Sequence, residues 1–372
     1  MATRVISARS DSQAASAAQE GARALKAGKL VAFATETVYG VAAIARDADA
    51  MASLRELKNR PQRPFTVHVG SPGDAHKYIK NMPLGAGWLI RKGWPGPVTV
   101  LAPVGGRLAE DRFQKAGLYD VLVSEDYIGL RCPELPLAMA MLSAVDWPVV
   151  APSANLAGQP SPRSAEEVLA GLEGKIDLLI DSGPTRYGKD STIVRFDSRG
   201  EHDIVRAGVL DERSIRKLVK LRLLFVCTGN TCRSPMAEGL AKKILRERLN
   251  CKDGNELRHL AEIESAGIFG ATGMPATPEA ALAARAHGVD ISRHRSQKLT
   301  SELIQAADMV FCMTDYHVEQ VRRLSPSSAE KVFRLDESGD IPDPIGGGEE
   351  VYVATAERIE RALRACLEKV TV

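Results

Sequence analysis

The sequence predicts an α/β protein with two domains, the second built on a doubly wound parallel sheet. The chain has 372 residues, which leaves room for two domains, and 44% of them are hydrophobic, which is enough for well-filled cores. In the C-terminal part, short apolar runs alternate with helical patterns. This alternation is typical of parallel strands joined by helices, with the functional site at the carboxyl ends of the strands.

The N-terminal domain is predicted to start with a surface helix within residues 1–26, where small and apolar residues recur at helical spacing. A strand over residues 29–33 then leads into a polar bend, Ala34-Thr35-Glu36-Thr37-Val38-Tyr39-Gly40. A helix over residues 49–58 ends at Lys58-Asn59-Arg60-Pro61, where two cations near a helix C-terminus stand before a proline. A strand over residues 65–69 carries His68.

Further polar motifs are spread over residues 94–208. They are Trp94-Pro95-Gly96-Pro97-Val98-Thr99, Gly129-Leu130-Arg131-Cys132-Pro133, Ala151-Pro152-Ser153-Ala154-Asn155, Asp190-Ser191-Thr192-Ile193 and Arg206-Ala207-Gly208. Together with the polar bend and the two cations, these motifs resemble the Sua5/YrdC family, the threonylcarbamoyl-AMP synthases. The resemblance covers about residues 21–210 and implies a mixed α/β domain with a twisted sheet, which we expect to span residues 1–210.

The resemblance implies a reaction in which L-threonine, bicarbonate and ATP give threonylcarbamoyl-AMP and pyrophosphate, a precursor for modifying adenosine-37 of tRNAs. ATP would come with Mg2+, and the cations that match its charges are Lys58, Arg60 and Arg206. The candidate partners of threonine are Thr35, His68, Arg131 and Ser191. The candidates for neutral hydrogen bonds to the nucleotide are Ser153, Asn155 and Ser161. Such catalysis needs mainly positioning and charge neutralisation, and no protein nucleophile or protein metal ligand is predicted.

The synthase residues also have plainer interpretations. Lys58 and Arg60 fit a solvated helix end, and His68 fits a core histidine. Ser153 and Asn155 fit a closed turn. The competing function for this domain is a binding module that holds double-stranded RNA on a concave basic surface without catalysis. The complete set of polar residues and the mixed-sign composition favour the enzyme.

Two segments of this domain depart from the patterns that they resemble. The segment after Arg60 reaches Pro64 one residue sooner than in the family pattern, which leaves the roles of Gln62 and Arg63 open. Residues 183–189 have the spacing of a phosphate-binding P-loop, but Asp190 stands where Ser or Thr would bind Mg2+. Because residues 191–196 alternate like a strand and a P-loop must open a helix, we interpret this segment as a connection between strands.

A charged segment joins the two domains. Residues 211–220 carry Ile215, Leu218 and Val219 at helical spacing, so we expect a helical linker and not a flexible tether.

The C-terminal domain is expected to span residues 221–372 and opens on the most informative stretch of the chain. An apolar run at residues 223–226 predicts a buried strand that ends at Cys227. Gly229 and Asn230 tolerate unusual backbone angles, and Ser234-Pro235 resembles an N-cap followed by proline at the first helical position. A loop in front of a helix N-terminus directs several N–H groups at one point, which suits a phosphate.

The residue types in this loop point to phosphoryl transfer. The field that holds phosphate also favours a thiolate, so we expect Cys227 to be a nucleophile near neutral pH. Arg233 offers a planar fork to the oxygens of the transferred group. Ser234 could donate its hydroxyl to the sulfur, and Asn230 could brace the loop. The plainer interpretation of Cys227 is a buried core thiol.

The strand, the sequence Cys-Thr-Gly-Asn-Thr-Cys-Arg-Ser-Pro and the helix resemble the low-molecular-weight protein tyrosine phosphatases, from about residue 221 to the end. The family implies an aspartic acid before proline as the general acid, which Asp343 matches better than Asp340; an ordinary turn is the alternative. It also implies that Cys232 forms a reversible protective disulfide with Cys227. Thr231 resembles the branch that hydrolyses phosphoarginine, so we favour a protein arginine phosphatase with no cofactor over a tyrosine phosphatase.

The remaining elements of the C-terminal domain follow from periodicity. Strands are expected to end at Gly267 and to cover residues 309–313, and helices to cover residues 235–249, 277–287, 318–324 and 352–370. The basic run Arg293-His294-Arg295 is more typical of a solvated turn than of a substrate contact.

Composition limits the cellular context. A net charge of +2 and a sequence pI near 8.2 give no large uniform field for nucleic acid or membranes. Six cysteines without regular spacing form no disulfide framework, and no second pair accompanies Cys227 and Cys232 to hold zinc. With a reactive thiolate and no long apolar run, we expect a cytoplasmic enzyme. Its expected partners are phosphorylated proteins and tRNA-modification proteins.

Overall fold

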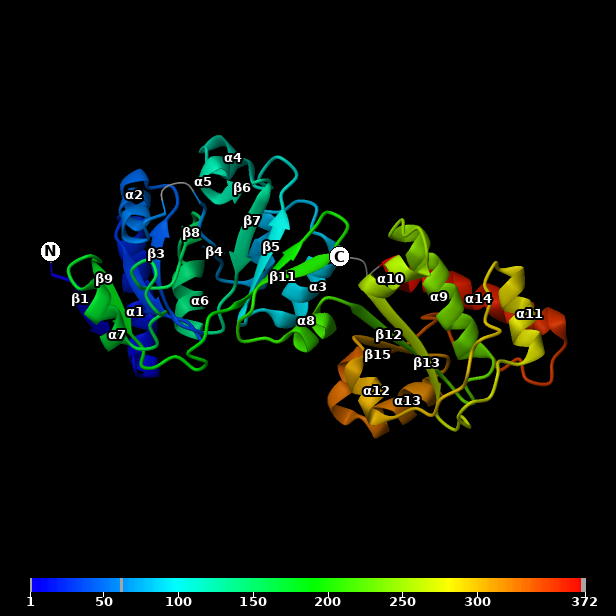
Figure 1. Cartoon of the computed structure of the whole chain (residues 1–372). Coiled ribbons are helices and arrows are strands. Elements are labelled where there is room, and N and C mark those ends of the chain that lie inside the picture. The colour runs from blue at the N-terminus through cyan, green and yellow to red at the C-terminus, as the bar shows by residue number, and fades with distance from the viewer. Residues whose placement is uncertain (1, 61–62, 369–372) are drawn as a thin grey trace. The chain divides into compact units, whose positions relative to one another are not determined.

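The structure is a computed structural model that describes residues 2–60 and 63–368 (Figure 1). Pro61, Gln62 and Val370, which entered the sequence interpretation, lie outside the described residues. Tertiary contacts divide the chain into two units, Met1–Val219 and Lys220–Val372. Among the helices that the structure describes, none combines the length and the apolar character needed to cross a bilayer.

The described residues of the first unit form one 11-stranded mixed sheet, with the order β1-β9-β2-β3-β8-β4-β7-β5-β10-β11 and β6 paired to β7. Its strands are β1 (Arg4–Ser7), β2 (Val31–Ala34), β3 (Tyr39–Ile44), β4 (Val67–His68), β5 (Val98–Pro103), β6 (Val123–Ser124), β7 (Tyr127–Arg131), β8 (Val149–Val150), β9 (Leu178–Asp181), β10 (Thr192–Phe196) and β11 (His202–Arg206). The mixture of parallel and antiparallel pairs confirms the mixed α/β expectation.

The helices of the first unit cover this sheet. They are α1 (Asp11–Lys26), α2 (Ala48–Leu57), α3 (Leu84–Gly93), α4 (Asp111–Lys115), α5 (Tyr119–Leu122), α6 (Pro136–Ser143), α7 (Ala165–Leu172) and α8 (Glu212–Leu218), with a 3-10 turn at Pro72–Lys77. Strands β2 and β3 are buried along their whole length. One face of these strands packs with α1 and α6, and the other face joins the core that includes α2. Full burial on both faces explains why these strands have continuous apolar runs and no alternation.

Local signals set the element ends in the first unit. Helix α2 begins where the Asp47 side chain accepts a hydrogen bond from the Ala50 N–H, as N-cap residues do. The strand expected over residues 65–69 is shorter, because β4 pairs with β7 over only two residues. The segment with P-loop spacing connects β9 to β10, as the sequence indicated. Helix α8, expected as a linker, belongs to the first unit and packs against α3.

The described residues of the second unit form a four-stranded parallel sheet in the order β13-β12-β14-β15, which confirms the doubly wound prediction. The strands are β12 (Leu221–Cys227), β13 (Ala261–Gly267), β14 (Met309–Cys312) and β15 (Val332–Arg334). The chain leaves β12 for β13 on one side and later returns to β14 on the other. The carboxyl end of β12 is therefore the point where the strand order reverses, which is where such sheets bind ligands.

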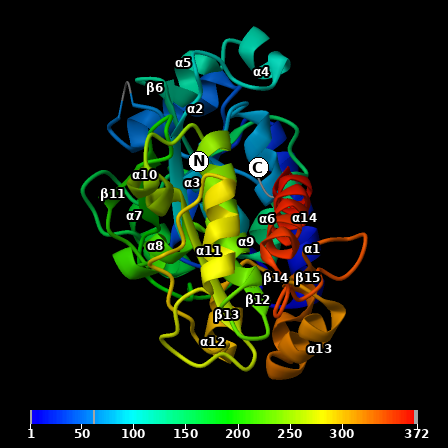
Figure 2. The same ribbon diagram turned by 90° about the vertical axis from the view of Figure 1, so that its right-hand side faces the viewer.

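Helices cover both faces of this sheet (Figures 1 and 2). They are α9 (Arg233–Arg248), α10 (Gly254–Leu260), α11 (Pro278–Ala286), α12 (Ser301–Ala306), α13 (Asp315–Leu324) and α14 (Glu349–Glu368), with a 3-10 turn at Pro326–Lys331. Helices α9, α11 and α14 pack on one another, while α12 and α13 contact the sheet strands. The positions expected from periodicity agree to within a few residues.

One helix start was predicted wrongly. Helix α9 begins at Arg233 with Cys232 as its N-cap, two residues before the proline that we took as the first helical position. Ser234 does not cap the helix, because its hydroxyl contacts the Cys227 sulfur and accepts a hydrogen bond from the Asn230 amide. Pro235 is tolerated inside the first turn, where its missing N–H would have no intrahelical partner.

Candidate active sites

The first candidate site is the loop from Cys227 to Arg233, which we call the cradle. It follows β12 and leads into α9. Asn230 has a φ of 56°, a left-handed conformation that asparagine tolerates better than most residues. Gly267, at the end of β13, lies directly behind the cradle: a Cβ atom there would come within 2.8 Å of the Thr228 carbonyl oxygen. The conformation of the cradle therefore depends on an asparagine at position 230 and on a glycine at position 267.

The Cys227 side chain sits inside the cradle and is only 3% exposed. Its sulfur accepts a hydrogen bond from the Asn230 backbone N–H at 3.3 Å and lies 3.0 Å from the Ser234 hydroxyl oxygen. A backbone N–H and a hydroxyl group thus converge on the sulfur.

Asn230 braces the cradle through its fully buried side chain. Its amide nitrogen donates to Ser234 Oγ and Ser265 Oγ, both at 2.9 Å, and its amide oxygen accepts from the Gln297 N–H at 2.8 Å. The Asn230 carbonyl lies 2.8 Å from His294 Nε2. The expectation of a solvated turn at residues 293–295 is therefore wrong for His294, which packs against the cradle.

Arg233 is buried and mostly paired. Its guanidinium donates to the Ile341 carbonyl at 3.0 Å and to Thr228 Oγ1 at 3.3 Å, and it forms an ion pair with Asp343. Its Nε atom is buried and has no hydrogen-bond partner among the described residues. A buried guanidinium N–H without a partner, in the loop that also carries the thiol, fits an anionic ligand such as a phosphoryl group.

The structure brings Asp343 to the cradle from a loop 110 residues further along the chain. Its side chain is 39% exposed, so the carboxylate is accessible to solvent. Asp340 is occupied elsewhere, because it accepts from the Asp315 N–H and pairs with Arg334.

Cys232 faces a second group of hydroxyls. Its sulfur lies 3.7 Å from Thr231 Oγ1, 3.7 Å from Thr277 Oγ1 and 3.6 Å from the Tyr352 hydroxyl. Burial raises the pKa of Tyr352 to about 12, so this hydroxyl stays protonated and available as a donor. Cys227 and Cys232 are both free thiols in this structure.

Sequence reasoning missed His317, which lies behind the cradle on α13. Its ring nitrogens are 3.0 Å from Thr228 Oγ1 and 2.6 Å from Thr314 Oγ1. Burial lowers the pKa of His317 to about 4, and the Arg233 guanidinium adds to this effect. The imidazole is therefore neutral at physiological pH. No sequence pattern joins His317 to Thr228, 89 residues apart, so only the fold reveals this contact.

The second candidate site lies in the first unit, around Arg131 at the end of β7. The Arg131 guanidinium, almost fully buried, donates to Glu36 Oε1 at 2.6 Å and Thr37 Oγ1 at 2.7 Å and lies 3.4 Å from Thr35 Oγ1. The other oxygen of Glu36 accepts from the Glu134 N–H. Glu36 was not predicted as a site residue, although it stands inside the polar bend.

His68 lies beside Arg131, because β4 and β7 pair these two residues. Burial lowers the pKa of His68 to about 3, with a further contribution from Arg131, so the ring is neutral. A neutral imidazole beside an arginine can donate or accept a hydrogen bond to an uncharged part of a ligand.

Lys58 reaches the Ser153–Asn155 loop. Its Nζ donates to the Ser153 carbonyl at 3.1 Å and to the carbonyl and side-chain oxygens of Asn155 at 2.7 and 2.9 Å. Burial lowers the pKa of Lys58 to about 8, and the neighbouring Arg60 contributes. Arg60 itself is exposed, with its guanidinium 5.4 Å from the centre of the Phe65 ring.

Arg206 makes hydrogen bonds to Ser191, and Asp190 links it to Ser161. It donates to the Ser191 carbonyl at 2.9 Å and the Ser191 hydroxyl at 3.0 Å, and Ser191 contacts Thr99 at 2.9 Å. Asp190 lies 3.9 Å from Arg206 and accepts from the Ser161 hydroxyl.

These groups influence one another electrostatically. Asp190 acts on the pKa values of both Lys58 and Arg206, and Arg131 acts on those of Arg206 and His68. In residues 2–60 and 63–368, no three or more metal-ligating side chains gather in one place. Asp190 is a carboxylate close to Lys58 and Arg206, while the Glu36 carboxylate pairs with Arg131.

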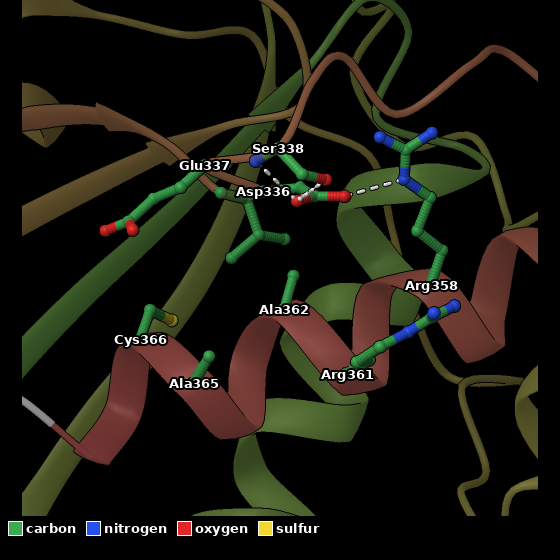
Figure 3. A pocket seen from close by; sticks show the side chains of 9 residues that line it. Asp336, Glu337, Ser338, Arg358, Arg361, Ala362, Ala365 and Cys366 are labelled. Carbon is green, nitrogen blue, oxygen red and sulfur yellow. Dashed lines mark hydrogen bonds and ion pairs between the residues drawn. The ribbon is translucent and has the colours of Figure 1, made fainter.

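A separate pocket of about 550 Å3 lies between α14 and the loop after β15 (Figure 3). Two of its charged side chains pair with each other: Asp336 pairs with Arg358 at 2.6 Å and also accepts from the Ser338 hydroxyl at 2.6 Å. None of the residues predicted to act in either site lines this pocket.

Comparison with known proteins gives two family matches. Residues 23–208 match the Sua5_yciO_yrdC family model, described as telomere recombination. Residues 222–372 match the family described as low molecular weight phosphotyrosine protein phosphatase.

Similar proteins exist for each part. The threonylcarbamoyl-AMP synthase of Pyrococcus abyssi is 34% identical over 218 residues, which is 58% of this chain and 61% of that protein. The protein-arginine-phosphatase of Bacillus subtilis is 39% identical over 148 residues, 38% of this chain and 91% of that protein. A solved variant of Pyrococcus abyssi Sua5 aligns with a TM-score of 0.50 at 22% identity over 97% of both chains, which shows likeness of fold. The chain spans 44 to 61% of the length of the synthases from Pyrococcus abyssi, Bacillus subtilis and Schizosaccharomyces pombe.

Proposed function

Because residues 23–208 belong to the Sua5/YrdC family and residues 222–372 belong to the low-molecular-weight phosphatase family, we propose that the chain is a bifunctional enzyme. The first unit makes threonylcarbamoyl-AMP and pyrophosphate from L-threonine, bicarbonate and ATP, for the modification of adenosine-37 in tRNA. The second unit removes phosphoryl groups from proteins. A reactive thiol favours a cytoplasmic setting, and tRNA-modification proteins are the natural partners of the first activity.

For the synthase, the supporting observation is the gathering of four cations around neutral hydroxyls. Arg131, held by Glu36 and flanked by Thr35, binds the threonine carboxylate, and the neutral His68 contacts the threonine hydroxyl. The cations Lys58, Arg60 and Arg206 bind the ATP phosphates. The neutral partners of the nucleotide are Ser153, Asn155 and Ser161, and Ser191 is a further partner of threonine. These residues act by positioning threonine and ATP and by neutralising the negative charge of the ATP phosphates.

Mg2+ fits this site as a companion of ATP. Magnesium in nucleotide sites is usually held by the phosphates and by one or two carboxylates, with several waters retained. Asp190 lies near Lys58 and Arg206 and can supply such a ligand. The ion would neutralise the phosphates and stabilise the departing pyrophosphate.

The synthase is tested by threonine- and bicarbonate-dependent release of pyrophosphate from ATP with ample Mg2+. We expect Arg60→Ala to abolish the release. As a matched control, we expect Arg107→Ala to retain it, because Arg107 is an exposed arginine paired with Asp111. Absence of release from the wild type would favour a non-catalytic module that holds double-stranded RNA.

For the phosphatase, the supporting observation is a buried thiol, a buried arginine and an accessible carboxylate in one cradle. The Cys227 thiolate attacks phosphorus and forms an S–P bond, while the bond to the leaving group breaks and Asp343 gives the leaving atom a proton. Water then attacks the phosphocysteine, Asp343 takes a proton from it, and phosphate leaves with the thiolate restored. Asp343 has to leave Arg233 before either step, because the ion pair occupies both groups.

We further propose phosphoarginine as the substrate. Thr231 presents a half-buried hydroxyl in the cradle, whose only recorded side-chain contact among the described residues is the Cys232 sulfur at 3.7 Å. This hydroxyl can orient the guanidinium or the attacking water. The Bacillus subtilis relative is named a protein-arginine-phosphatase.

The preference is measured as the Cys227-dependent rate on phosphoarginine proteins and on phosphotyrosine peptides. We expect the first to be faster in the wild type, and Thr231→Ile to shift the ratio toward phosphotyrosine. A faster wild-type rate on phosphotyrosine would make the second unit a tyrosine phosphatase.

A further inference from the structure

A chain of three side chains runs from α13 to the catalytic arginine of the second unit. Thr314 is the N-cap of α13, and its Oγ1 lies 2.6 Å from His317 Nδ1. His317 Nε2 lies 3.0 Å from Thr228 Oγ1, which in turn accepts a hydrogen bond from the Arg233 guanidinium at 3.3 Å. His317 is 2% exposed, so water does not compete for these contacts. We infer that His317 is a positioning residue, which fixes Arg233 through the Thr228 hydroxyl.

The hydrogen positions in this chain follow from what each atom can donate. Arginine only donates, so Thr228 Oγ1 must accept from Arg233. The Thr228 hydroxyl hydrogen then needs an acceptor, and an unprotonated Nε2 of His317 provides one. His317 carries its hydrogen on Nδ1 and donates it to Thr314 Oγ1. One tautomer of the neutral ring therefore satisfies every contact, and the lowered pKa of His317 keeps the ring neutral.

This anchor becomes important when substrate binds. In the free protein the guanidinium nitrogen that contacts Thr228 is also paired with Asp343. The proposed reaction removes Asp343 from this pair, because the carboxyl group must donate a proton to the leaving group. Thr228 Oγ1 and the Ile341 carbonyl are then the remaining fixed acceptors that hold the guanidinium among the described residues.

The groups that face His317 support a positioning role and no part in proton transfer. Besides Thr228 and Thr314, it lies within electrostatic range of Arg233 from α9 and of Asp340 and Asp343 from the loop after β15. The His317 and Tyr316 rings lie edge to face, with ring centres 5.9 Å apart. No recorded contact joins His317 to the Cys227 sulfur among the described residues, so it acts on the reaction through Arg233.

The inference rests on the proposed phosphatase function and is tested on the full chain with p-nitrophenyl phosphate as the probe. Thr228→Val removes the hydroxyl with little change of shape, and His317→Leu removes the ring acceptor. We expect each to lower kcat about tenfold or more with a smaller change in KM, because losing a hydrogen bond to a charged group in the transition state has about this effect. Thr228→Ser and His317→Gln keep the acceptors and should stay within about threefold of the wild type.

A double variant tests whether Thr228 and His317 act on Arg233 through their shared contact or independently of each other. If Thr228 and His317 act through one contact, combining Thr228→Val with His317→Leu lowers kcat little beyond either single change. Additive losses would overturn the inference, and so would a wild-type rate in both single variants. If His317→Leu does not fold, the two Thr228 variants together with the tautomer of the His317 ring in the wild type decide the question.

Two further measurements separate this inference from the function on which it rests. A wild type without Cys227-dependent hydrolysis would refute the phosphatase itself, whereas an active wild type with unaffected variants would refute only the relay. Nitrogen-15 NMR of the His317 ring should show the hydrogen on Nδ1 and no titration between about pH 5 and 8. A ring that titrates in this range would contradict the assigned role.

Discussion

At the scale of single residues, the two buried arginines show how one kind of ion pair serves different purposes. Arg131 and Glu36 are both almost fully buried, and Glu36 is held by a further N–H group. This pair is a permanent part of the first site, because neither member can reach water. Arg233 is equally buried, but the side chain of its partner Asp343 is 39% exposed. The second pair can open toward solvent and close again.

The permanence of the first pair leads to a prediction for Glu36→Gln. The amide keeps the size of the side chain but removes the charge that orients Arg131, and we expect about a tenfold higher KM for threonine, with a loss of about 1–3 kcal/mol of stability. Threonine-dependent pyrophosphate release and thermal unfolding measure the two effects. Glu134→Gln is the matched control, because the Glu134 side chain is half-exposed and only its backbone N–H contacts Glu36. Equal KM values in the two variants would contradict the role of Glu36.

The lowered pKa of Lys58 leads to a second prediction. Its folded value of about 8 lies below the ordinary 10.5, so near pH 8 the free protein begins to lose a proton that the unfolded chain keeps. A bound anion raises the pKa again, and binding of ATP at about pH 8.5 therefore takes up protons.

Titration calorimetry in buffers of different ionisation enthalpy measures this uptake. Lys58→Arg keeps the charge but does not titrate in this range, so the uptake should shrink in that variant. The same uptake in wild type and variant would show that another group is responsible.

At the scale of elements, two local patterns were enough to place most of the second unit. Short apolar runs predicted the strands β12, β13 and β14, and apolar residues at helical spacing predicted most of the helices. These patterns are local, and the sequence shows them directly. The start of α9 could not be predicted, because whether Ser234 caps a helix or contacts a thiol depends on the cradle behind it. Glu36 and His317 were missed for a related reason. Their partners lie 95 and 89 residues away, and no spacing rule connects residues across a fold.

The packing of β13 behind the cradle leads to a prediction for Gly267→Ala. The added Cβ would meet the Thr228 carbonyl oxygen at 2.8 Å and the Asn230 nitrogen at 2.9 Å, and both are backbone atoms that cannot turn aside. We expect about a hundredfold loss of phosphatase activity from displacement of the cradle by a fraction of an ångström.

Gly254→Ala is the matched control for this change. Gly254 starts α10 in the same unit and has open space around it, so the variant should keep full activity. Pyrophosphate release by the first unit checks that each preparation is intact. Full phosphatase activity in Gly267→Ala would show that the cradle tolerates displacement.

At the scale of the whole molecule, the chain consists of two units with separate sheets and separate candidate sites. Every recorded contact of the cradle lies within residues 220–372, and every recorded contact around Arg131 lies within residues 1–219. The sequence predicted the two families, because each carries several motifs of unusual composition. It did not predict the side-chain pairs that complete the sites.

The separation of the sites leads to a prediction about the full chain. Cys227→Ser should abolish hydrolysis of phosphoprotein and leave pyrophosphate release unchanged, and Arg60→Ala should have the opposite effects. Both activities are measured on the same preparations of wild type and variants. A variant that lowers both activities without lowering the unfolding temperature would mean that the two sites are coupled.

The joint between the units has a consequence for how the cell can use them. Helix α8 ends at Leu218 and β12 begins at Leu221, and the flanking Val219 and Leu221 are only 1% and 2% exposed. Only the partly exposed Lys220 separates these two buried residues, so the joint has no long exposed segment of the kind that proteases cut. Because both proposed sites lie on one chain, they are synthesised in a ratio of one to one, and separate control of the two proposed activities has to act through substrate supply or inhibition.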